Sequence, residues 1–393
     1  MARSLTSLWL KNLRALSKFQ KSQQKLLKSV AAATKRATQA ATKAAANSAA
    51  KVTRSKPKAA VRTEPAASHA ERAQHAQHPP PVAEALPGSW TRSYTDASDG
   101  RRMAYWLYLP KCDVTSEADA TQPLPLVVML HGCTQTAPEF AEGTRMNALA
   151  QRKGFAVLYP QQLVTVDSNR CWQWYQPTTQ QGSNEAEQVA HMLSHVVAKH
   201  ALDASRVYLA GMSAGAALAN IIALRYPLQV AAVGMHSSPV FGMADNRMQA
   251  FGVMQAGAGS VSGLLHAVQP FVAAHDFPAM PAMLLHGDAD NVVRVTNVAQ
   301  LAKQFCAVNG LTEASPPPVV HQTPADATGS NPHHAFQTQN YQVGGKTRIS
   351  VCSIAGLDHA WSGGDSTLRF NDSMGPDASA LLWAFFAKHQ RSS

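Results

Sequence analysis

From about Trp90 onward the sequence alternates short apolar runs with segments of helical spacing, and this alternation constrains the fold more than any other feature. Apolar runs of four to six residues fit buried strands. Strands that alternate with helices favour a mostly parallel sheet, because parallel neighbours need a crossover between them. We therefore expect an α/β domain over residues 89–393, with a central sheet covered by helices on both faces. The predicted strands are 105–109, 126–130, 155–159, 206–210, 230–235, 282–285 and 349–354, and the predicted helices are 185–199, 214–225, 296–308 and 378–388.

The net charge of +11 belongs to the N-terminal segment. Residues 1–78 hold sixteen Lys and Arg against two Glu, which gives this segment +14 and leaves the remainder at −3. At about 4–30, apolar and basic residues recur at helical steps, as in an amphipathic helix that binds a surface. An Ala-, Lys- and Pro-rich linker follows. We expect residues 1–88 to form a basic arm that binds an apolar or anionic surface, with nucleic acid less favoured, or that is a solvated leader without a partner.

The composition excludes several classes of protein. With 45% apolar residues the chain has enough material for a core, and no apolar run approaches the ~18 residues of a membrane span. The best candidate for the core of a secretory signal, Leu8-Trp9-Leu10, is interrupted by Lys11, which favours a cytoplasmic location over an extracellular one. The five cysteines lack CxxC spacing, so we expect no metal site. The sequence has no P-loop or dinucleotide fingerprint, and we expect no cofactor. Cys306 and Cys352 would pair only in an exported protein.

A stretch with the pattern GxSxG lies between a predicted strand and a predicted helix. It reads Gly211-Met212-Ser213-Ala214-Gly215. Small residues on both sides of a serine allow the tight strand-to-helix turn that exposes its hydroxyl. The helix that follows directs the positive end of its dipole toward Ser213. We therefore predict Ser213 to be a nucleophile.

A serine hydroxyl becomes a good nucleophile when a histidine removes its proton and a carboxylate orients that histidine. In sheets of this type the acid and the histidine follow the serine along the chain. Asp290 follows one predicted strand, and Asp288 competes for the same role two residues earlier. His359 follows the last predicted strand, and this position selects it among the sixteen histidines. We predict Ser213, Asp290 and His359 to form a catalytic triad.

A serine that attacks a carbonyl also needs N–H donors for the negative charge that develops on oxygen. The sequence Leu130-His131-Gly132-Cys133 ends a predicted strand upstream of the nucleophile, where such a loop is expected. We predict the backbone amides of Cys133 and Ala214 to form this oxyanion hole. Cys133 is either a structural thiol or a disulfide partner, with Cys171 as a candidate, and its amide serves in both cases.

Five blocks of sequence together resemble the polyhydroxybutyrate (PHB) depolymerase family of esterases, within the α/β-hydrolase superfamily. The first, third and last of them are far more specific than GxSxG. The resemblance implies a serine esterase acting on polyesters of short-chain hydroxy acids or on their oligomers, and it matches the same three triad residues. The blocks are His131-Gly132-Cys133-Thr134-Gln135, Tyr159-Pro160-Gln161-Gln162, Cys171-Trp172-Gln173-Trp174, Gly211-Met212-Ser213-Ala214-Gly215 and His359-Ala360-Trp361-Ser362-Gly363-Gly364.

Three tryptophans are candidates for binding the substrate. Trp172 and Trp174 form a cluster with Tyr175 that either lines the cleft for an ester chain or packs under a loop. Trp361, two residues after the predicted base, joins these candidates.

Two other interpretations stay open. Feruloyl and acetylxylan esterases share the fold and the triad but would require export, which the arm argues against. Alternatively, the chain is a granule- or DNA-associated interaction protein with a vestigial site, although its triad and oxyanion loop are intact. Secreted family members typically carry a signal peptide, and many have a C-terminal binding domain. Expecting neither here, we predict that the arm attaches the enzyme to an intracellular polymer granule or its anionic coat.

Overall fold

The computed structural model describes residues 86–96, 100, 102–111, 122–329 and 332–391. Contacts divide the chain into two units, Met1–Gln77 and His78–Ser393, and every described residue belongs to the second. The amphipathic helix expected at about 4–30, and the linker after it, lie outside the described residues. The role of the arm therefore stays a prediction.

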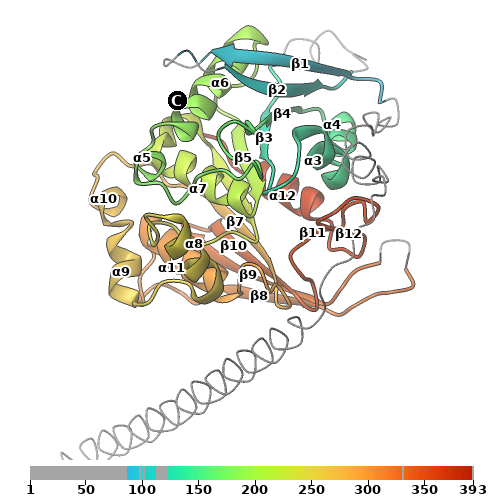
Figure 1. Ribbon diagram of the computed structural model, residues 1–393. Coiled ribbons are helices and arrows are strands. Elements are labelled where there is room, and N and C mark those ends of the chain that lie inside the picture. The colour runs from blue at the N-terminus through green and yellow to red at the C-terminus, as the bar shows by residue number, and fades with distance from the viewer. Residues whose placement is uncertain (1–85, 97–99, 101, 112–121, 330–331, 392–393) are drawn as a thin grey trace, which may run out of the picture. The chain divides into compact units, whose positions relative to one another are not determined.

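The described elements follow one another in the α/β order that the sequence predicts (Figure 1). The strands are β1 (Ser89–Asp96), β2 (Arg102–Leu109), β3 (Leu126–Leu130), β4 (Ala156–Pro160), β5 (Val207–Met212), β6 (Ala232–His236), β7 (Ala282–Gly287), β8 (Val319–Thr323), β9 (Phe336–Val343), β10 (Lys346–Ile354), β11 (Trp361–Ser362) and β12 (Asn371–Asp372). The helices are α3 (Ala137–Thr144), α4 (Met146–Lys153), α5 (Pro177–Gln180), α6 (Glu185–Lys199), α7 (Ala214–Arg225), α8 (Arg247–Ala256), α9 (Val261–His266), α10 (Gln269–Val272), α11 (Thr296–Val308) and α12 (Ala378–Phe386), with a 3-10 turn η2 (Pro227–Gln229).

Within the described residues, ten strands form one sheet in the order β1-β2-β4-β3-β5-β6-β7-β10-β9-β8. The centre, from β4 to β10, is parallel throughout. Antiparallel pairs close both edges, with β1 and β2 on one side and β8 and β9 on the other. This arrangement confirms the α/β fold with a parallel centre. It places the carboxyl ends of β5, β7 and β10, and the loops that follow them, along one edge of the sheet.

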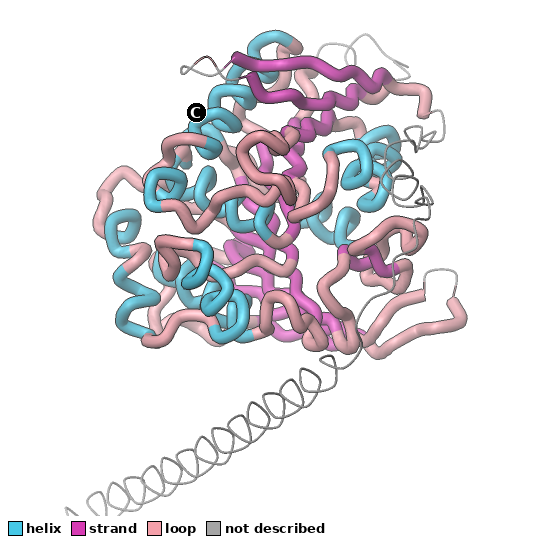
Figure 2. The backbone as a smooth tube through the Cα atoms, in the orientation of Figure 1, coloured by secondary structure: helices cyan, strands magenta, loops and turns pink. Residues whose placement is uncertain are grey.

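Side chains of the central strands alternate between two cores, one on each face of the sheet. In β3, Leu126, Val128 and Leu130 pack into the core covered by α6, α7 and α11. Val127 and Met129 of the same strand pack into the opposite core, beneath α3, α4 and α12. Figure 2 shows the strands running through the middle of the domain with helices on either side. Both faces are therefore covered, as a parallel sheet requires.

The helix that follows Ser213 is apolar around most of its circumference. In α7 every residue from Ala214 to Leu224 is buried, and the helix packs on β5 and β6. Its small residues allow this close approach, because alanine and glycine keep the helix axis near the strands. The position of Ser213 is thereby fixed by the best-packed part of the domain.

Several elements were not expected from sequence, among them the strand β1, the helices α3–α5 and two further features of the fold. The edge strands β8 and β9 are partly exposed and polar, so they lack the apolar run that identifies a buried strand. Between β6 and β7, three short helices α8–α10 replace a single long crossover. Asn246 and Ser260 cap α8 and α9 by accepting backbone N–H groups, and Gly257 ends α8. This segment borders the candidate site.

Candidate active site

Ser213 occupies a sharp turn between β5 and α7. Its backbone angles are φ 55° and ψ −122°, a strained conformation for a residue other than glycine. The turn fits because a glycine lies two residues before the serine and another two residues after it. A Cβ on Gly211 would lie 2.5 Å from the backbone of Gly215, and one on Gly215 would overlap the carbonyl oxygen of Leu130. The Ser213 amide donates to the carbonyl of His236 at 2.9 Å. The sequence GxSxG therefore folds into the turn that presents a serine hydroxyl.

His359 lies in the loop after β10 and is bound to Asp290, in the loop after β7. The distance from His359 Nδ1 to Asp290 Oδ2 is 2.8 Å, and the aspartate is 1% exposed. The second carboxylate oxygen of Asp290 accepts the amides of Val292 and Val293 at 2.9 and 2.8 Å. Asp290 is thus held rigidly, and its bond leaves Nε2 of His359 as the ring nitrogen that faces away from the acid.

Asp288, the competing acid, makes a different contact. Its Oδ1 accepts the amide of Gly356 at 2.7 Å, and its side chain is exposed. It therefore binds the loop that leads to His359, and not the histidine ring. The structure brings Asp290 to His359 and places Asp288 in a supporting position.

Electrostatics keep the Asp290 carboxylate ionised. Burial raises its pKa, but the hydrogen bond and charge of His359, together with the Val293 amide, hold the pKa of Asp290 below its usual value. Nε2 of His286 lies 3.6 Å from the same carboxylate and 2.7 Å from the carbonyl of Val293. Burial lowers the pKa of His286, so this ring is neutral and donates its Nε2 hydrogen.

His236, at the end of β6, connects the nucleophile turn to the histidine loop, and sequence reasoning did not identify it. Its carbonyl binds the Ser213 amide, and its Nε2 accepts the amide of Ser362 at 3.4 Å. Its ring also stacks on Trp361, with centroids 5.2 Å apart. Burial, reinforced by the neighbouring histidines, lowers the pKa of His236 to about 3, so the ring is neutral and can accept. Its place at the carboxyl end of a parallel strand is the signal that could have revealed it.

The predicted oxyanion loop lies against the nucleophile. A Cβ on Gly132 would be 3.7 Å from the Cβ of Ser213, and the Gly132 amide donates to Gln135 Oε1 at 2.8 Å. Within the described residues, the neighbouring amide of Cys133 has no hydrogen-bond acceptor. The amide of Ala214 is the first of α7 and so has no acceptor within the helix. These are the two amides that the sequence predicts as donors.

A disulfide and a buried histidine hold this loop in place. Cys133 is bonded to Cys171, which settles the alternative left open by the sequence. Nε1 of Trp172 donates to the carbonyl of His131 at 2.9 Å. Nε2 of His131 accepts the amide of Gln162 at 3.2 Å, and burial lowers the pKa of His131 to about 4. The loop is thus fixed by neutral partners.

A buried carboxylate, that of Glu185, binds residues that contact the oxyanion loop. Glu185, the first residue of α6, is 3% exposed and accepts the side-chain amide of Gln162 and the backbone amide of Gln173. Gln162 also donates to the carbonyl of Cys171 at 3.2 Å. Glu185 therefore ties the disulfide segment to α6. Its role was not apparent from sequence, where it reads only as an acidic residue in a first helical turn.

The three candidate tryptophans are buried. Trp172 and Trp361 are 0% and 1% exposed, and Trp174 is 6% exposed. Trp361 packs edge-on against Phe140 at 5.4 Å and donates to Ser379 Oγ at 3.3 Å. Because rings so placed present almost no surface to a ligand, the structure puts Trp172 and Trp361 beneath the loops of the site. The packing alternative describes them better than the cleft-lining one.

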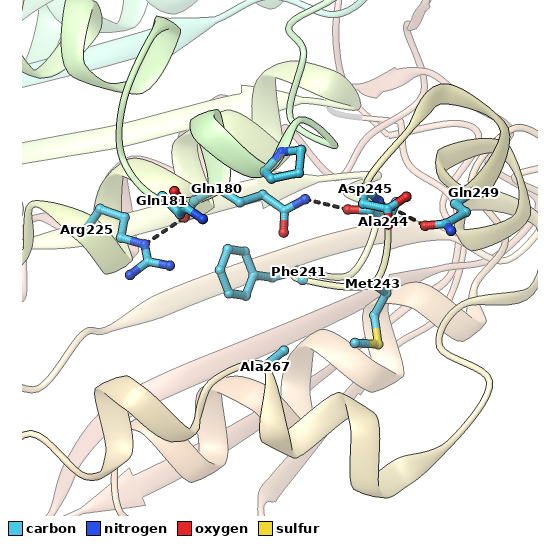
Figure 3. A pocket seen from close by; sticks show the side chains of 11 residues that line it. Gln180, Gln181, Arg225, Phe241, Met243, Ala244, Asp245, Gln249 and Ala267 are labelled. Carbon is cyan, nitrogen blue, oxygen red and sulfur yellow. Dashed lines mark hydrogen bonds between the residues drawn. The ribbon is translucent and has the colours of Figure 1, made fainter.

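A cavity of about 430 Å³ lies apart from these groups (Figure 3). Arg225, at the opposite end of α7 from Ser213, lines it together with Gln180 and Phe241, and no triad residue does. The Arg225 side chain donates to the carbonyl of Gln180 at 2.6 Å and lies over the ring of Phe271. We assign this cavity no part in the chemistry at Ser213.

Other expectations concern metals, cysteines and membranes. Among the described residues, no cluster of His, Cys, Asp and Glu could hold a metal ion. Cys306 and Cys352 are unpaired, and burial raises their pKa values to about 11 and about 12. In the same part of the chain, no helix combines the length and apolar character needed to cross a membrane.

The parallel sheet and the turn at Ser213 place this chain in the α/β-hydrolase class. A family model described as "Esterase PHB depolymerase" matches residues 103–323, and the chain belongs to this family. The resemblance noted in the sequence is thereby confirmed.

Individual relatives agree with this membership. The chain is 30% identical to poly(3-hydroxyalkanoate) depolymerase C of Paucimonas lemoignei, over 60% of its own length and 54% of the relative's. It is 28% identical to probable acetylxylan esterase A of Neosartorya fischeri, over 56% of its own length and 59% of the relative's. The chain therefore spans little more than half of these relatives.

A solved structure shares the fold. Acetyl xylan esterase from Aspergillus awamori matches with a TM-score of 0.58 and 18% sequence identity, covering 77% of this chain and 100% of that one. At this identity the likeness is one of fold alone.

Proposed function

We propose that this protein is a serine esterase that hydrolyses poly(3-hydroxybutyrate)-type polyesters or their oligomers. The observation that carries the proposal is the 2.8 Å bond between His359 and the buried Asp290, and a serine in a strained strand-to-helix turn at the same edge of the sheet supports it. A histidine oriented by an ionised carboxylate is what a serine needs in order to act as a nucleophile. Similarity to a polyhydroxyalkanoate depolymerase supports the choice of substrate.

In the proposed reaction, Ser213 Oγ attacks the ester carbonyl while Nε2 of His359 takes its proton. The amides of Cys133 and Ala214 donate to the oxygen that becomes negatively charged. His359 then gives the proton to the departing alcohol, and an acyl-enzyme remains on Ser213. Water, deprotonated by His359, attacks this acyl group and releases the hydroxy acid. Asp290 stays ionised and holds the imidazole throughout.

A feruloyl or acetylxylan-type esterase is the second candidate. Similarity to an acetylxylan esterase favours it, and the proposed chemistry at Ser213 would be unchanged. An interaction protein with a vestigial site is disfavoured by the Asp290–His359 bond and by the disulfide that holds the oxyanion loop.

One panel of substrates tests these alternatives. Purified protein and its Ser213→Ala variant are assayed on amorphous poly(3-hydroxybutyrate), on soluble hydroxybutyrate oligomers, and on acetylated and feruloylated xylan. The proposal expects Ser213-dependent release of hydroxy acid from the polymer or the oligomers. Turnover of xylan esters alone would favour the second candidate, and no Ser213-dependent turnover of any ester would leave only an interaction protein.

For the basic arm, we propose a placing role on a polymer granule or an anionic partner. The support is the +14 charge of residues 1–78 and their helical periodicity. Residues 1–60 fused to a fluorescent protein should collect on granules in polymer-accumulating cells, and a diffuse signal would reject this role.

The location of the enzyme is a separate proposal. A Cys133–Cys171 disulfide persists in oxidising compartments and so supports the extracellular alternative, in which the arm would bind an anionic partner instead of an intracellular granule. Thiol alkylation of the protein directly on cell lysis should leave these two cysteines unmodified. Modification of both cysteines in the native host would favour a cytoplasmic location.

A further inference from the structure

Several large apolar side chains are exposed on the loops around the candidate site. Met248 and Phe251 of α8 are 85% and 63% exposed. Val164, in the loop after β4, and Val292 and Val295, in the loop after β7, are exposed as well. We call these five residues the apolar face. Exposed apolar residues are ordinary when scattered, so the argument depends on their arrangement.

Hydrogen bonds join the segments that carry these residues. Phe251 and Gln255 are four residues apart and lie on the same side of α8. Nε2 of Gln255 donates to the carbonyls of Asn291 and Val292 at 3.2 and 3.1 Å. The amide of Arg294 donates to the carbonyl of Met254 at 2.8 Å. The stripe of α8 that carries Phe251 therefore runs directly onto the loop that carries Val292.

At its other end, α8 is bonded to the loop after β4. The guanidinium of Arg247 donates to Asp167 Oδ2 at 2.6 Å, and Val164 lies three residues before this aspartate. Cys171 is bonded to Cys133 of the oxyanion loop, and its amide donates to the other carboxylate oxygen of Asp167. The three segments that carry the apolar face are thus bonded to one another and to the loops that hold the site.

The order of the strands places this surface around the nucleophile. Along the sheet the strands run β4-β3-β5-β6-β7, and Ser213 follows β5. Val164 follows β4 and Val292 follows β7, so they flank Ser213 on both sides at the carboxyl edge. Val292 is also two residues from Asp290 and donates its amide to that carboxylate.

The chemistry of the segment indicates what this face contacts. From Met248 to His275 the sequence holds no Asp, Glu, Lys or Arg. The only charged residue of α8, Arg247, is paired with Asp167. A nucleic acid or an anionic membrane would be met by a cluster of basic side chains, whereas this surface carries two separate arginines, Arg294 and the Arg247 that is paired with Asp167. An aliphatic polyester exposes methyl, methylene and ester groups without charge, and it gains from burying apolar area against such a surface.

We propose that the apolar face is the surface by which the catalytic domain adsorbs to solid aliphatic polyester, so that chains enter the site directly from the polymer. The proposal rests on the proposed function and specifies its substrate as a solid. Salt does not screen adsorption through the apolar face, whereas attraction through a charged arm weakens as salt rises.

The test uses the full-length protein carrying Ser213→Ala, so that the polymer is not consumed. Depletion from solution by amorphous poly(3-hydroxybutyrate) particles is measured in 0.5 M NaCl for this protein and for a Met248→Ser/Phe251→Ser form of it. We expect the double substitution to weaken adsorption by about tenfold, because the apolar area of two large side chains is no longer buried against the polymer. The same substitutions in the active enzyme should leave kcat/KM on soluble p-nitrophenyl butyrate within about twofold, since neither residue touches the triad.

Two controls are matched to the chain. Met248→Leu/Phe251→Leu keeps the apolar area and should adsorb like the parent. Leu228→Ser removes a side chain that is 68% exposed but lies after α7, at the edge of the sheet opposite the site, and should change nothing.

Unchanged adsorption of the serine double variant would overturn the proposal, and so would an equal loss in Leu228→Ser. A loss of binding to vesicles of anionic phospholipid without a loss on polymer would also overturn it. Failure of the proposed function is seen separately, as absence of Ser213-dependent hydrolysis of the soluble ester and of the polymer.

Discussion

The ring of Trp361 stacks on the ring of His236, with centroids 5.2 Å apart and 25° between their planes. Trp361 lies two residues after His359, and the carbonyl of His236 holds the amide of Ser213. This stack therefore connects the loop of the proposed base to the turn of the proposed nucleophile. Their relative position depends on His236, a buried histidine that its lowered pKa keeps neutral.

Replacement of that histidine by a ring without an acceptor should disturb catalysis more than binding. In His236→Phe the stack on Trp361 is kept, but the Ser362 amide loses its acceptor. We expect kcat on a soluble ester to fall by about 10- to 100-fold, because small displacements of reacting groups are costly, with little change in KM. Steady-state kinetics, with circular dichroism to show that the fold is kept, provides the measurement. An unchanged kcat would show that His236 only fills space.

The two candidate acids should separate clearly. Asp290→Asn changes the partner of His359 Nδ1 and should lower kcat by about 10³- to 10⁴-fold. Asp288→Asn keeps an oxygen for the Gly356 amide and should lower kcat by no more than about threefold. Comparable losses in both variants would contradict the assignment of Asp290.

Stability should fall as the solution becomes acidic. His131 and His236 have pKa values lowered by burial from 6.5 to about 4 and about 3. In the unfolded chain both bind protons below about pH 6.5, while the folded protein stays unprotonated until much lower pH. Each histidine therefore removes about 1.4 kcal/mol of stability per pH unit between roughly pH 6 and 4. Urea unfolding at pH 7.5, 6 and 5 measures this slope, and a stability independent of pH over this range would contradict it.

Reduction of the disulfide should weaken both the fold and the oxyanion loop. Cys133 and Cys171 are 38 residues apart in sequence, and closing a loop of this size stabilises the folded state by about 3–4 kcal/mol in the chain-entropy model. We expect Cys171→Ser to lower Tm by several degrees and to lower kcat, because the Cys133 amide loses its anchor. A variant with unchanged Tm and kcat would show that the other contacts of the loop suffice.

The centre of the fold was predictable because its signals are local and strong. The helices at Glu185–Lys199, Ala214–Arg225 and Thr296–Val308 coincide with their predicted bounds. Helical spacing of apolar residues marks the first and the last of them, and Tyr226-Pro227 ends the second. The strand before Ser213 extends two residues further than expected, to Met212, because the turn begins only at the serine. The edge strand β9 was not predicted, because it is rich in polar residues and its conformation depends on pairing with β10.

Some residues of the candidate site could also be predicted from sequence and others could not. Ser213, Asp290 and His359 could be selected from their places after strands, because topology brings those loops to one edge. His236 and Glu185 could not, because their roles depend on contacts with residues far away in the chain. The tryptophans were ambiguous for a related reason: an aromatic residue near a site suits both a cleft and a core, and only burial distinguishes them.

The central claim is that Ser213 is the nucleophile of an esterase. Incubation with the organophosphate diethyl p-nitrophenyl phosphate, followed by peptide mass spectrometry, tests it most directly. We predict one diethylphosphoryl group per chain, on Ser213, with hydrolysis of p-nitrophenyl butyrate lost in parallel and both effects slowed by hydroxybutyrate oligomers. Full activity with Ser213 labelled, or loss of activity with the label on another residue, would contradict the account.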